Sequence, residues 1–201
     1  MPHTLAPFAC LDLVNSRFAD HVGSGEVYDR LERREWQSWF LSRWQLELEG
    51  PDAPVPLPAL RRLRQVSREL LESWACNRPP DGSALDALNA FLAGAPAVRR
   101  LDPRGLAAPP RLVPLRRDWS WVLAEVASSL AELAASGDPR RLKTCGNPAC
   151  TFMFYDDSQN RSRRWCESAI CGNLVKVREF RDRRRRAAAP SSDLEGDGSD
   201  R

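Results

Sequence analysis

The chain has 201 residues, of which 42% are hydrophobic and 28% are charged, and its formal net charge is +3. A chain of this length and composition can bury a substantial core without covalent cross-links. It is therefore not a small fold that depends on disulfides, and we expect either one domain or a domain followed by a small module.

The N-terminal stretch MPHTLAPFACLDLVNSRFAD lacks the basic region of an export signal, and Pro7, Asp12 and Asn15 interrupt its apolar residues. No stretch of the chain approaches the roughly 18 apolar residues of a membrane span. We expect a cytoplasmic protein without a membrane partner, in a compartment where thiols stay reduced.

The charges divide the chain into three parts. Residues 1–138 carry 16 Lys/Arg and 18 Asp/Glu, residues 139–186 carry 13 and 5, and residues 187–201 carry 1 and 4. A nearly neutral body is thus followed by a basic module with a net charge of +8 and by an acidic tail. The tail is polar and has no periodicity, so we expect it to be disordered.

The body is predicted to be mainly helical, with an α+β character from one small β-hairpin. A proline-rich linker, 51–58, separates two of its helices. Two short apolar runs in 97–117 flank a Gly/Pro-rich connection and indicate the hairpin, although the prolines weaken that signal. Apolar residues at helical spacing predict four helices, over residues 28–50, 59–77, 82–94 and 118–139.

Several conspicuous side chains of the body fit a packing role. Cys10 and Cys76 are expected to be buried apolar thiols, and neither His3 nor His21 has a recognisable catalytic context. We find no enzyme constellation and expect no enzyme activity. Large aromatic side chains dominate core burial, so the same packing role is expected for Trp36, Trp39, Trp44, Trp74, Trp119 and Trp121.

The other four cysteines follow the pattern Cys145-x4-Cys150-x15-Cys166-x4-Cys171. Four thiolates satisfy the tetrahedral preference of zinc and leave no open coordination position, as in structural sites. Disulfides would need an oxidising compartment, a thioredoxin-like site uses C-x-x-C, and ferredoxins space their cysteines differently. The pattern therefore favours one structural Zn²⁺ held by these four residues.

The spacer between the two cysteine pairs is predicted to contain a short β-hairpin in TFMFYDDSQNRSRRW, residues 151–165, because aromatic residues precede the turn-forming DDSQN. A basic helix follows from Cys166 to about Arg186. In the treble-clef arrangement that we expect, the second cysteine pair lies in the first turn of this helix, so that the metal fixes the helix direction.

The segment LKTCGNPACTFMFYDDSQNRSRRWCESAICGNL resembles the CGNR zinc finger, and the resemblance covers residues 142–186. That pattern runs Cys-x4-Cys, an aromatic strand ending in Asp, an Arg/Ser-rich approach and Trp-Cys-x4-Cys-Gly-Asn-Arg. Upstream, FACLDLVNS (8–16) resembles the opening signature of the ABATE domain, which precedes this finger. The resemblance implies a transcription regulator, in some members linked to stress responses, whose finger binds DNA.

One position departs from the family pattern. Leu174 stands where the final Arg of CGNR is expected, which weakens the inference of base reading but leaves the metal inference intact. Ile170, Leu174 and Val177 would form an i, i+4, i+7 stripe, so a packing role for Leu174 is consistent with the sequence.

The basic module predicts a nucleic-acid partner, with DNA as the first choice. Lys and Arg supply affinity for phosphates, and Arg and Asn can read base edges. The N-terminal domain would then sense a small-molecule effector or mediate oligomerisation, for example as a homodimer. The predicted contacts are Asn160, Arg161, Arg163, Arg164, Lys176, Arg178, Arg181 and Arg183.

Three other interpretations of the module are weighed against DNA binding. Phe152, Phe154, Tyr155 and Trp165 could stack unpaired RNA bases, although packing in the small finger core is favoured. The finger could instead be a zinc-stabilised module that binds a protein partner. The basic helix could also be a solvated surface without a partner.

Overall fold

The structure is a computed structural model that describes residues 7–50, 52–101 and 110–188. The predicted acidic tail, 187–201, lies outside these residues except for its first two positions. Helices dominate the described part, together with small two-stranded antiparallel sheets. This agrees with the predicted mainly helical fold with a C-terminal four-cysteine finger; the treble-clef description of the finger stays a prediction.

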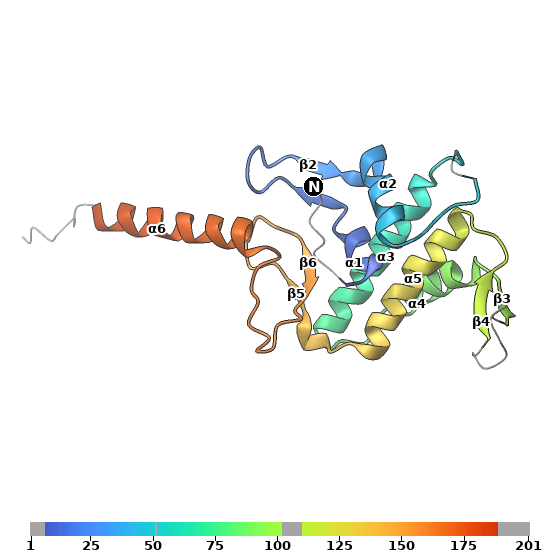
Figure 1. The fold of residues 1–201 in the computed structure, drawn as a ribbon. Helices are drawn as coiled ribbons and strands as arrows, with labels where there is room; N and C mark the ends of the chain where they lie inside the picture. Colours follow the sequence, from blue (N-terminus) through green and yellow to red (C-terminus); the bar gives the residue numbers. More distant parts are fainter. Residues whose placement is uncertain (1–6, 51, 102–109, 189–201) are drawn as a thin grey trace, which may run out of the picture.

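The described residues of the body form five α-helices (Figure 1). Helix α5 contacts α1, α3 and α4, and α3 in turn packs against α1 and α4. The predicted apolar stripe of α5 is confirmed, because Val122, Val126, Leu130 and Leu133 are all buried. The bounds of the helices are α1 Ala9–Val14, α2 Arg34–Arg43, α3 Leu57–Ala75, α4 Gly82–Ala93 and α5 Trp119–Ser136.

The helix ends follow from local chemistry. Asp118 accepts hydrogen bonds from the backbone N–H groups of Ser120 and Trp121 and so caps the N-terminus of α5.

Cys76 follows α3 directly and is exposed, so its predicted burial is wrong, whereas Cys10 is fully buried in α1 as expected.

Two hairpins belong to the body. β1 (Arg17–Ala19) pairs with β2 (Val27–Asp29), and β3 (Ala97–Arg100) pairs with β4 (Arg111–Pro114), which confirms the hairpin expected in 97–117. The helix predicted over 28–50 is wrong at its start, because its first residues form β2 and a 3-10 turn. Apolar spacing alone could not reveal that β2 has a partner ten residues upstream.

The third hairpin opens the finger. β5 (Leu142–Thr144) pairs with β6 (Met153–Tyr155), so that the first cysteine pair lies in the connection between them. The hairpin predicted within 151–165 is therefore wrong: only 153–155 forms a strand, and its partner precedes Cys145. Leu142 and Met153 belong to the same hydrophobic core as the helices of the body.

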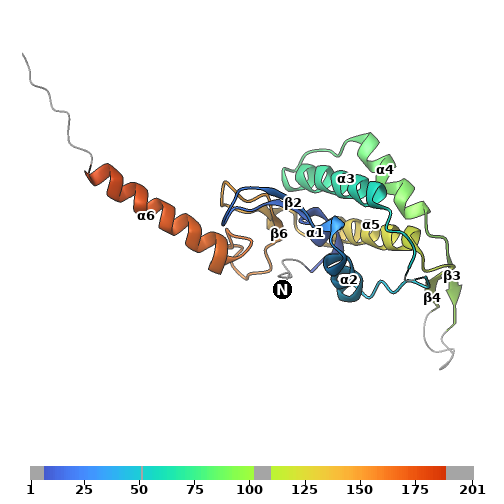
Figure 2. The same ribbon diagram turned by 90° about the horizontal axis from the view of Figure 1, so that it is seen from above.

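The last helix, α6 (Asn173–Ala188), follows a π-helical turn at Ser168–Gly172. The predicted start of the helix at Cys166 is therefore wrong: Cys166 precedes the π-helical turn, and Cys171 lies within that turn rather than in the first turn of α6. It extends away from the body on the side of the finger, whereas β3 and β4 lie at the opposite end (Figures 1 and 2). The finger thus stands between a packed helical body and a projecting basic helix. No helix among the described residues is long and apolar enough to cross a membrane.

Candidate metal centre and nucleic-acid interface

The four cysteines of the repeated pattern converge on one point. Their Sγ atoms all lie within 4.8 Å of one another, and all four side chains are buried. Cys166 Sγ lies 3.8 Å from Cys150 Sγ and 3.5 Å from Cys171 Sγ. Four sulfurs about 2.3 Å from a central Zn²⁺ would be separated by about 3.8 Å, so these residues fit a tetrahedral site.

Backbone and side-chain donors surround the sulfurs. The Cys166 N–H donates to Cys145 Sγ at 3.5 Å, and the side-chain amide of Asn147 donates to Cys171 Sγ at 3.6 Å. His21 Nε2 lies 3.1 Å from the same Cys171 sulfur. Such outer contacts orient ligands and offset the charge that four thiolates bring.

The close packing of the thiols shifts their pKa values in opposite directions: the hydrogen bond with Cys166 lowers the pKa of Cys150 to about 5. Burial raises the pKa of Cys171 to about 12. The pKa of Cys166 is also raised, first by its hydrogen bond with Cys150 and then by burial. Several thiolates so close together repel one another, and a divalent cation is what allows all four to lose their protons. The cluster therefore suits a closed, structural ion.

Trp165 fills the space beside the cluster and explains two glycines of the motif. A Cβ at Gly146 would lie 2.9 Å from the Trp165 ring, and a Cβ at Gly172 would lie 3.0 Å from it. Both positions must therefore lack a side chain for the ring to fit between them. Gly172 is the glycine of the Cys-Gly-Asn sequence, so its role here is steric.

A buried carboxylate organises the loop that leads from β6 to the second cysteine pair. Asp156 is fully buried, and it accepts hydrogen bonds from Lys143 Nζ at 2.6 Å and from the Ser158 and Arg163 N–H groups at 3.0 Å. Burial opposes its charge, but the hydrogen bonds from Lys143 and Ser158 outweigh burial and hold the pKa of Asp156 below its usual range. The loop therefore has a fixed shape.

The buried side-chain amide of Asn15 connects the body to the finger. Asn15 Nδ2 donates to the Met153 carbonyl at 2.7 Å, and the Met153 N–H donates to Asn15 Oδ1 at 2.9 Å. Beside this clamp, Phe18 packs edge-on against Phe152 with ring centroids 5.7 Å apart. The Asp138 N–H also donates to the Tyr155 hydroxyl at 2.9 Å. The finger is thus docked on the body by polar and aromatic contacts.

The predicted nucleic-acid residues of the loop differ in their surroundings. Asn160, Arg161 and Arg164 are exposed, and Arg161 forms an ion pair with Asp138 at 3.3 Å. Arg163 is turned inward: its guanidinium donates to the carbonyls of its neighbours Trp165 and Cys166 and lies 4.6 Å from the centre of the Phe154 ring.

The predicted residues of α6 are all exposed: Lys176, Arg178, Arg181 and Arg183. Arg178 also contacts the finger and the body, because its guanidinium donates to Asn147 Oδ1 and to the His21 carbonyl, both at 3.3 Å. Leu174 is half-buried, whereas Val177 is 46% exposed, so the predicted apolar stripe is covered only near the metal cluster.

The aromatic residues of the finger lie mainly in its core. Phe152 and Phe154 are buried in a cluster with the four cysteines, and Trp165 packs against that cluster. Tyr155 is half-buried and packs edge-on against Phe8, with ring centroids 5.9 Å apart. The favoured interpretation, that these rings pack rather than project, is confirmed for the two phenylalanines.

Sequence reasoning did not identify three residues around the cluster: Asn15, His21 and Asn147. Asn15 and His21 lie in the first 21 residues of the chain, and 138 and 150 residues separate them from the finger residues that they contact. No spacing rule links such distant positions. Asn147 lies between Cys145 and Cys150, and this position was the one signal in the sequence that could have placed it beside the cluster.

Two family models match the chain. The CGNR zinc finger matches residues 141–184, and ABATE, described as "Putative stress-induced transcription regulator", matches residues 9–137. Both are regulator or zinc-finger families and not enzyme families. No curated protein matches the chain.

The finger match and the close grouping of four buried cysteines together support one structural zinc. The ABATE match spans more than half of the chain and ends directly after α5. The chain therefore belongs to the ABATE family and carries a C-terminal CGNR zinc finger.

Proposed function

We propose that this protein binds DNA through its finger and α6 and regulates transcription, with one structural Zn²⁺ held by Cys145, Cys150, Cys166 and Cys171. The observation that carries this proposal is the projection of α6. The helix starts two residues after Cys171 and extends clear of the body (Figure 2), with its basic side chains exposed.

The dimensions and charge of α6 suit a duplex. Its 16 residues include 7 Lys/Arg and 2 Asp/Glu. At 1.5 Å per residue the helix is about 24 Å long, and the major groove of B-DNA admits an α-helix. Each phosphate neutralised by a Lys or Arg releases counterions and adds affinity that depends on salt.

The predicted contacts fall into two roles. Lys176, Arg181 and Arg183 are exposed on α6 and are assigned to the nucleic acid, together with Asn160, Arg161 and Arg164 on the approach loop. Arg163 and Arg178 hydrogen-bond within the protein, so they are assigned to positioning the loop and α6. Their guanidinium groups would still add positive potential near the interface.

The body is assigned a regulatory role in the same proposal. Residues 1–138 would sense an effector or mediate oligomerisation, 139–186 would bind the target, and 187–201 would remain a disordered tail. A regulator of this kind acts in the cytoplasm, at the nucleoid. The contacts of Asn15 and His21 with the finger provide a physical connection through which the body could act on it.

RNA binding and protein binding are the alternative functions. RNA recognition by stacking would need exposed aromatic rings, and Phe152 and Phe154 are buried. A protein partner would favour apolar contacts, and Phe180 on α6 is 53% exposed. The charge of α6 favours a polyanion over such a partner.

Fluorescence anisotropy tests the proposal with the zinc-loaded protein, labelled duplex DNA and labelled single-stranded RNA. We expect duplex binding that weakens as salt rises and is lost when a chelator removes zinc. Preference for RNA would support the stacking alternative instead. Absence of binding to both nucleic acids, with zinc retained, would contradict the proposal and leave the protein-binding alternative.

A further inference from the structure

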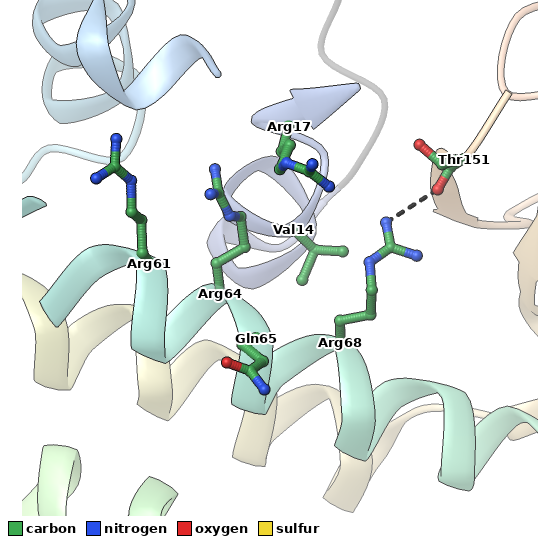
Figure 3. A pocket seen from close by; sticks show the side chains of 7 residues that line it. All are labelled: Val14, Arg17, Arg61, Arg64, Gln65, Arg68 and Thr151. Atoms are coloured by element: carbon green, nitrogen blue, oxygen red, sulfur yellow. Dashed lines mark hydrogen bonds between the residues drawn. The ribbon is translucent and has the colours of Figure 1, made fainter. Parts of the chain in front are cut away.

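A hollow lined by arginines lies between α3, the first β-strand and the finger, and none of the roles above uses it. Its volume is about 470 Å³, and it is lined in part by Arg17, Arg61, Arg64 and Arg68 (Figure 3). The last three rise from one side of α3, and Arg17 comes from β1 (Figure 3). Small-molecule sites typically measure about 300–1,000 Å³.

The lining is suited to an anion. It contains four guanidinium groups, the amide of Gln65 and the hydroxyl of Thr151, beside the apolar Val14, and no acidic side chain of the described residues borders it. Guanidinium groups present planar N–H donors that match the oxygens of phosphate and carboxylate groups and can bind them bidentately.

Carboxylates outside the lining hold two of these arginines in place. Asp29 accepts from Arg64 at 2.6 and 2.8 Å and from Arg61 Nε at 3.4 Å. The side chain of Arg64 is only 11% exposed, and it also donates to Ser16 Oγ at 2.9 Å. These contacts fix where the guanidinium groups lie, so the arginine side chains lose less conformational entropy when a ligand binds.

Arg17 differs from the arginines of α3. Arg17 is exposed, and among the described residues its guanidinium makes no hydrogen bond or ion pair, although it borders the same hollow. Asp29, the Cα partner of Arg17 in the β1–β2 register, is already bound to Arg64. A positive charge without a partner is thus left facing the hollow, whose other three arginines are paired with Glu32, Asp29 and Glu72.

The hollow adjoins the finger directly. Arg68 Nη2 donates to the Thr151 carbonyl at 2.9 Å, and Thr151 follows Cys150 in the chain (Figure 3). The other guanidinium nitrogen of Arg68 donates to Glu72 at 3.1 Å. An anion that attracts Arg68 would therefore act on the backbone next to a cysteine of the metal cluster.

We propose that this hollow binds a small molecule bearing phosphate or carboxylate groups, and that Arg68 transmits its binding to the finger through Thr151. Arg17 supplies the free charge, and Arg64 and Arg61 supply donors that Asp29 holds in place. The hollow is separate from α6, so the inference does not depend on the binding of DNA.

Binding is tested on the zinc-loaded full chain with inorganic phosphate and with succinate, by thermal unfolding at an ionic strength matched with chloride. We expect Tm to rise with at least one of the two anions, because a ligand that binds only the folded state stabilises it. A response to phosphate alone or to succinate alone identifies the class of ligand. No rise above chloride with either anion, up to about 10 mM, overturns the proposal.

Variants locate the site. Arg17→Gln is expected to raise the apparent Kd for the anion about tenfold, because it removes one charge-assisted contact. The Tm measured without the anion should stay unchanged. Arg62→Gln, on an exposed position of α3 outside the lining, and Arg181→Gln, on α6, remove the same charge and should leave Kd unchanged. An equal effect of all three variants, or an effect of Arg181→Gln alone, would place the anion elsewhere and overturn the proposal.

The coupling has a separate readout, the rate at which zinc passes to a chromogenic chelator. We expect the bound anion to change this rate by about twofold or more in the wild-type chain. Arg68→Gln should abolish that change. An anion that binds in the hollow and leaves the zinc transfer rate unchanged would remove the coupling while the binding site stands.

Discussion

Helices α3 and α6 are both rich in arginine, but they use the charge in opposite ways. In α3, Arg64 is buried against Asp29 and Ser16, and Arg68 bridges Glu72 and the finger. In α6, Lys176, Arg181 and Arg183 are exposed, and among the described residues none of these three forms an ion pair.

The difference shows that arginine content alone does not predict function, because the function of each guanidinium depends on what it contacts. A guanidinium held by a carboxylate organises the fold or a small binding site, because its charge is already partly compensated. A guanidinium that faces water keeps its charge available for a polyanion. The same residue type therefore serves a packed body in one helix and a projecting surface in the other.

The largest expected effect comes from removing a zinc ligand, because the metal holds α6 whereas an apolar core holds α3. Cys166→Ser should lose the zinc and the fixed direction of α6, because structural zinc contributes about 10 kcal/mol or more of folding free energy. Helices α1–α5 should persist, since their core is apolar. Zinc content by mass spectrometry and helicity by circular dichroism are the measurements. Cys76→Ser, an exposed cysteine outside the cluster, is the control, and one zinc retained by Cys166→Ser would exclude the four-cysteine site.

The second prediction concerns the partnered arginine of α3. Arg64→Ala should lower the free energy of unfolding by about 3 kcal/mol, because it leaves Asp29 partly buried without its main counter-charge. Arg62→Ala, at an exposed position of α3 two residues before Arg64, should change the free energy of unfolding by less than about 0.5 kcal/mol. Urea unfolding of the zinc-loaded chain compares the two. Equal losses would mean that α3, like α6, carries its arginines without structural partners.

The third prediction tests the contact between body and finger. Asn15→Ala should cost about 2 kcal/mol, because the N–H and carbonyl of Met153 would stay buried without their hydrogen-bond partner. Amide hydrogen exchange should then accelerate at β6. Asn89→Ala, on the exposed face of α4, is the matched control. Unchanged exchange at β6 in Asn15→Ala would show that the finger does not rely on this clamp.

The fourth prediction, of similar size, concerns a buried acid of the body. Burial raises the pKa of Asp12 to about 7, although a hydrogen bond from Trp44 and the charges of Arg43 and Arg30 oppose the rise. Because the folded-state pKa lies above the ordinary value, the stability that the protonated group contributes is lost as pH rises towards 7. Between pH 5 and 8 this amounts to about 2 kcal/mol.

Asp12→Asn removes that titration. Its free energy of unfolding, relative to that of wild type, should therefore increase by about 2 kcal/mol from pH 5 to pH 8, in urea unfolding at each pH. Asp52→Asn, at an exposed position between α2 and α3, should show no such trend. A constant difference between Asp12→Asn and wild type across the pH range would mean that Asp12 is charged throughout.

Part of this account could be predicted from the sequence. Helical periodicity identified α3, α4 and α5, and the spacing of the cysteines identified the cluster, because both signals are local. The strand β2 was missed because Val27 and Tyr28 continue the apolar spacing of the segment that follows. The partner of β6 was missed because three-residue strands leave almost no pattern.

The rest depends on contacts between distant parts of the chain. Nothing around Asn15 or His21 indicates that they reach the finger, and nothing around Arg61, Arg64 and Arg68 indicates that they share a hollow with Arg17. The sequence could identify α6 as basic, but not as exposed. Only the fold distinguishes the paired arginines from the free ones.

The most direct test of the central claim is the salt dependence of duplex DNA binding by the zinc-loaded chain. Lys176→Gln, Arg181→Gln and Arg183→Gln combined should reduce the slope of log K against log salt by about 2.7, because each phosphate contact contributes about 0.9. Arg62→Gln should leave the slope unchanged. A slope that is the same in wild type and the triple variant would contradict the assignment of α6 to DNA.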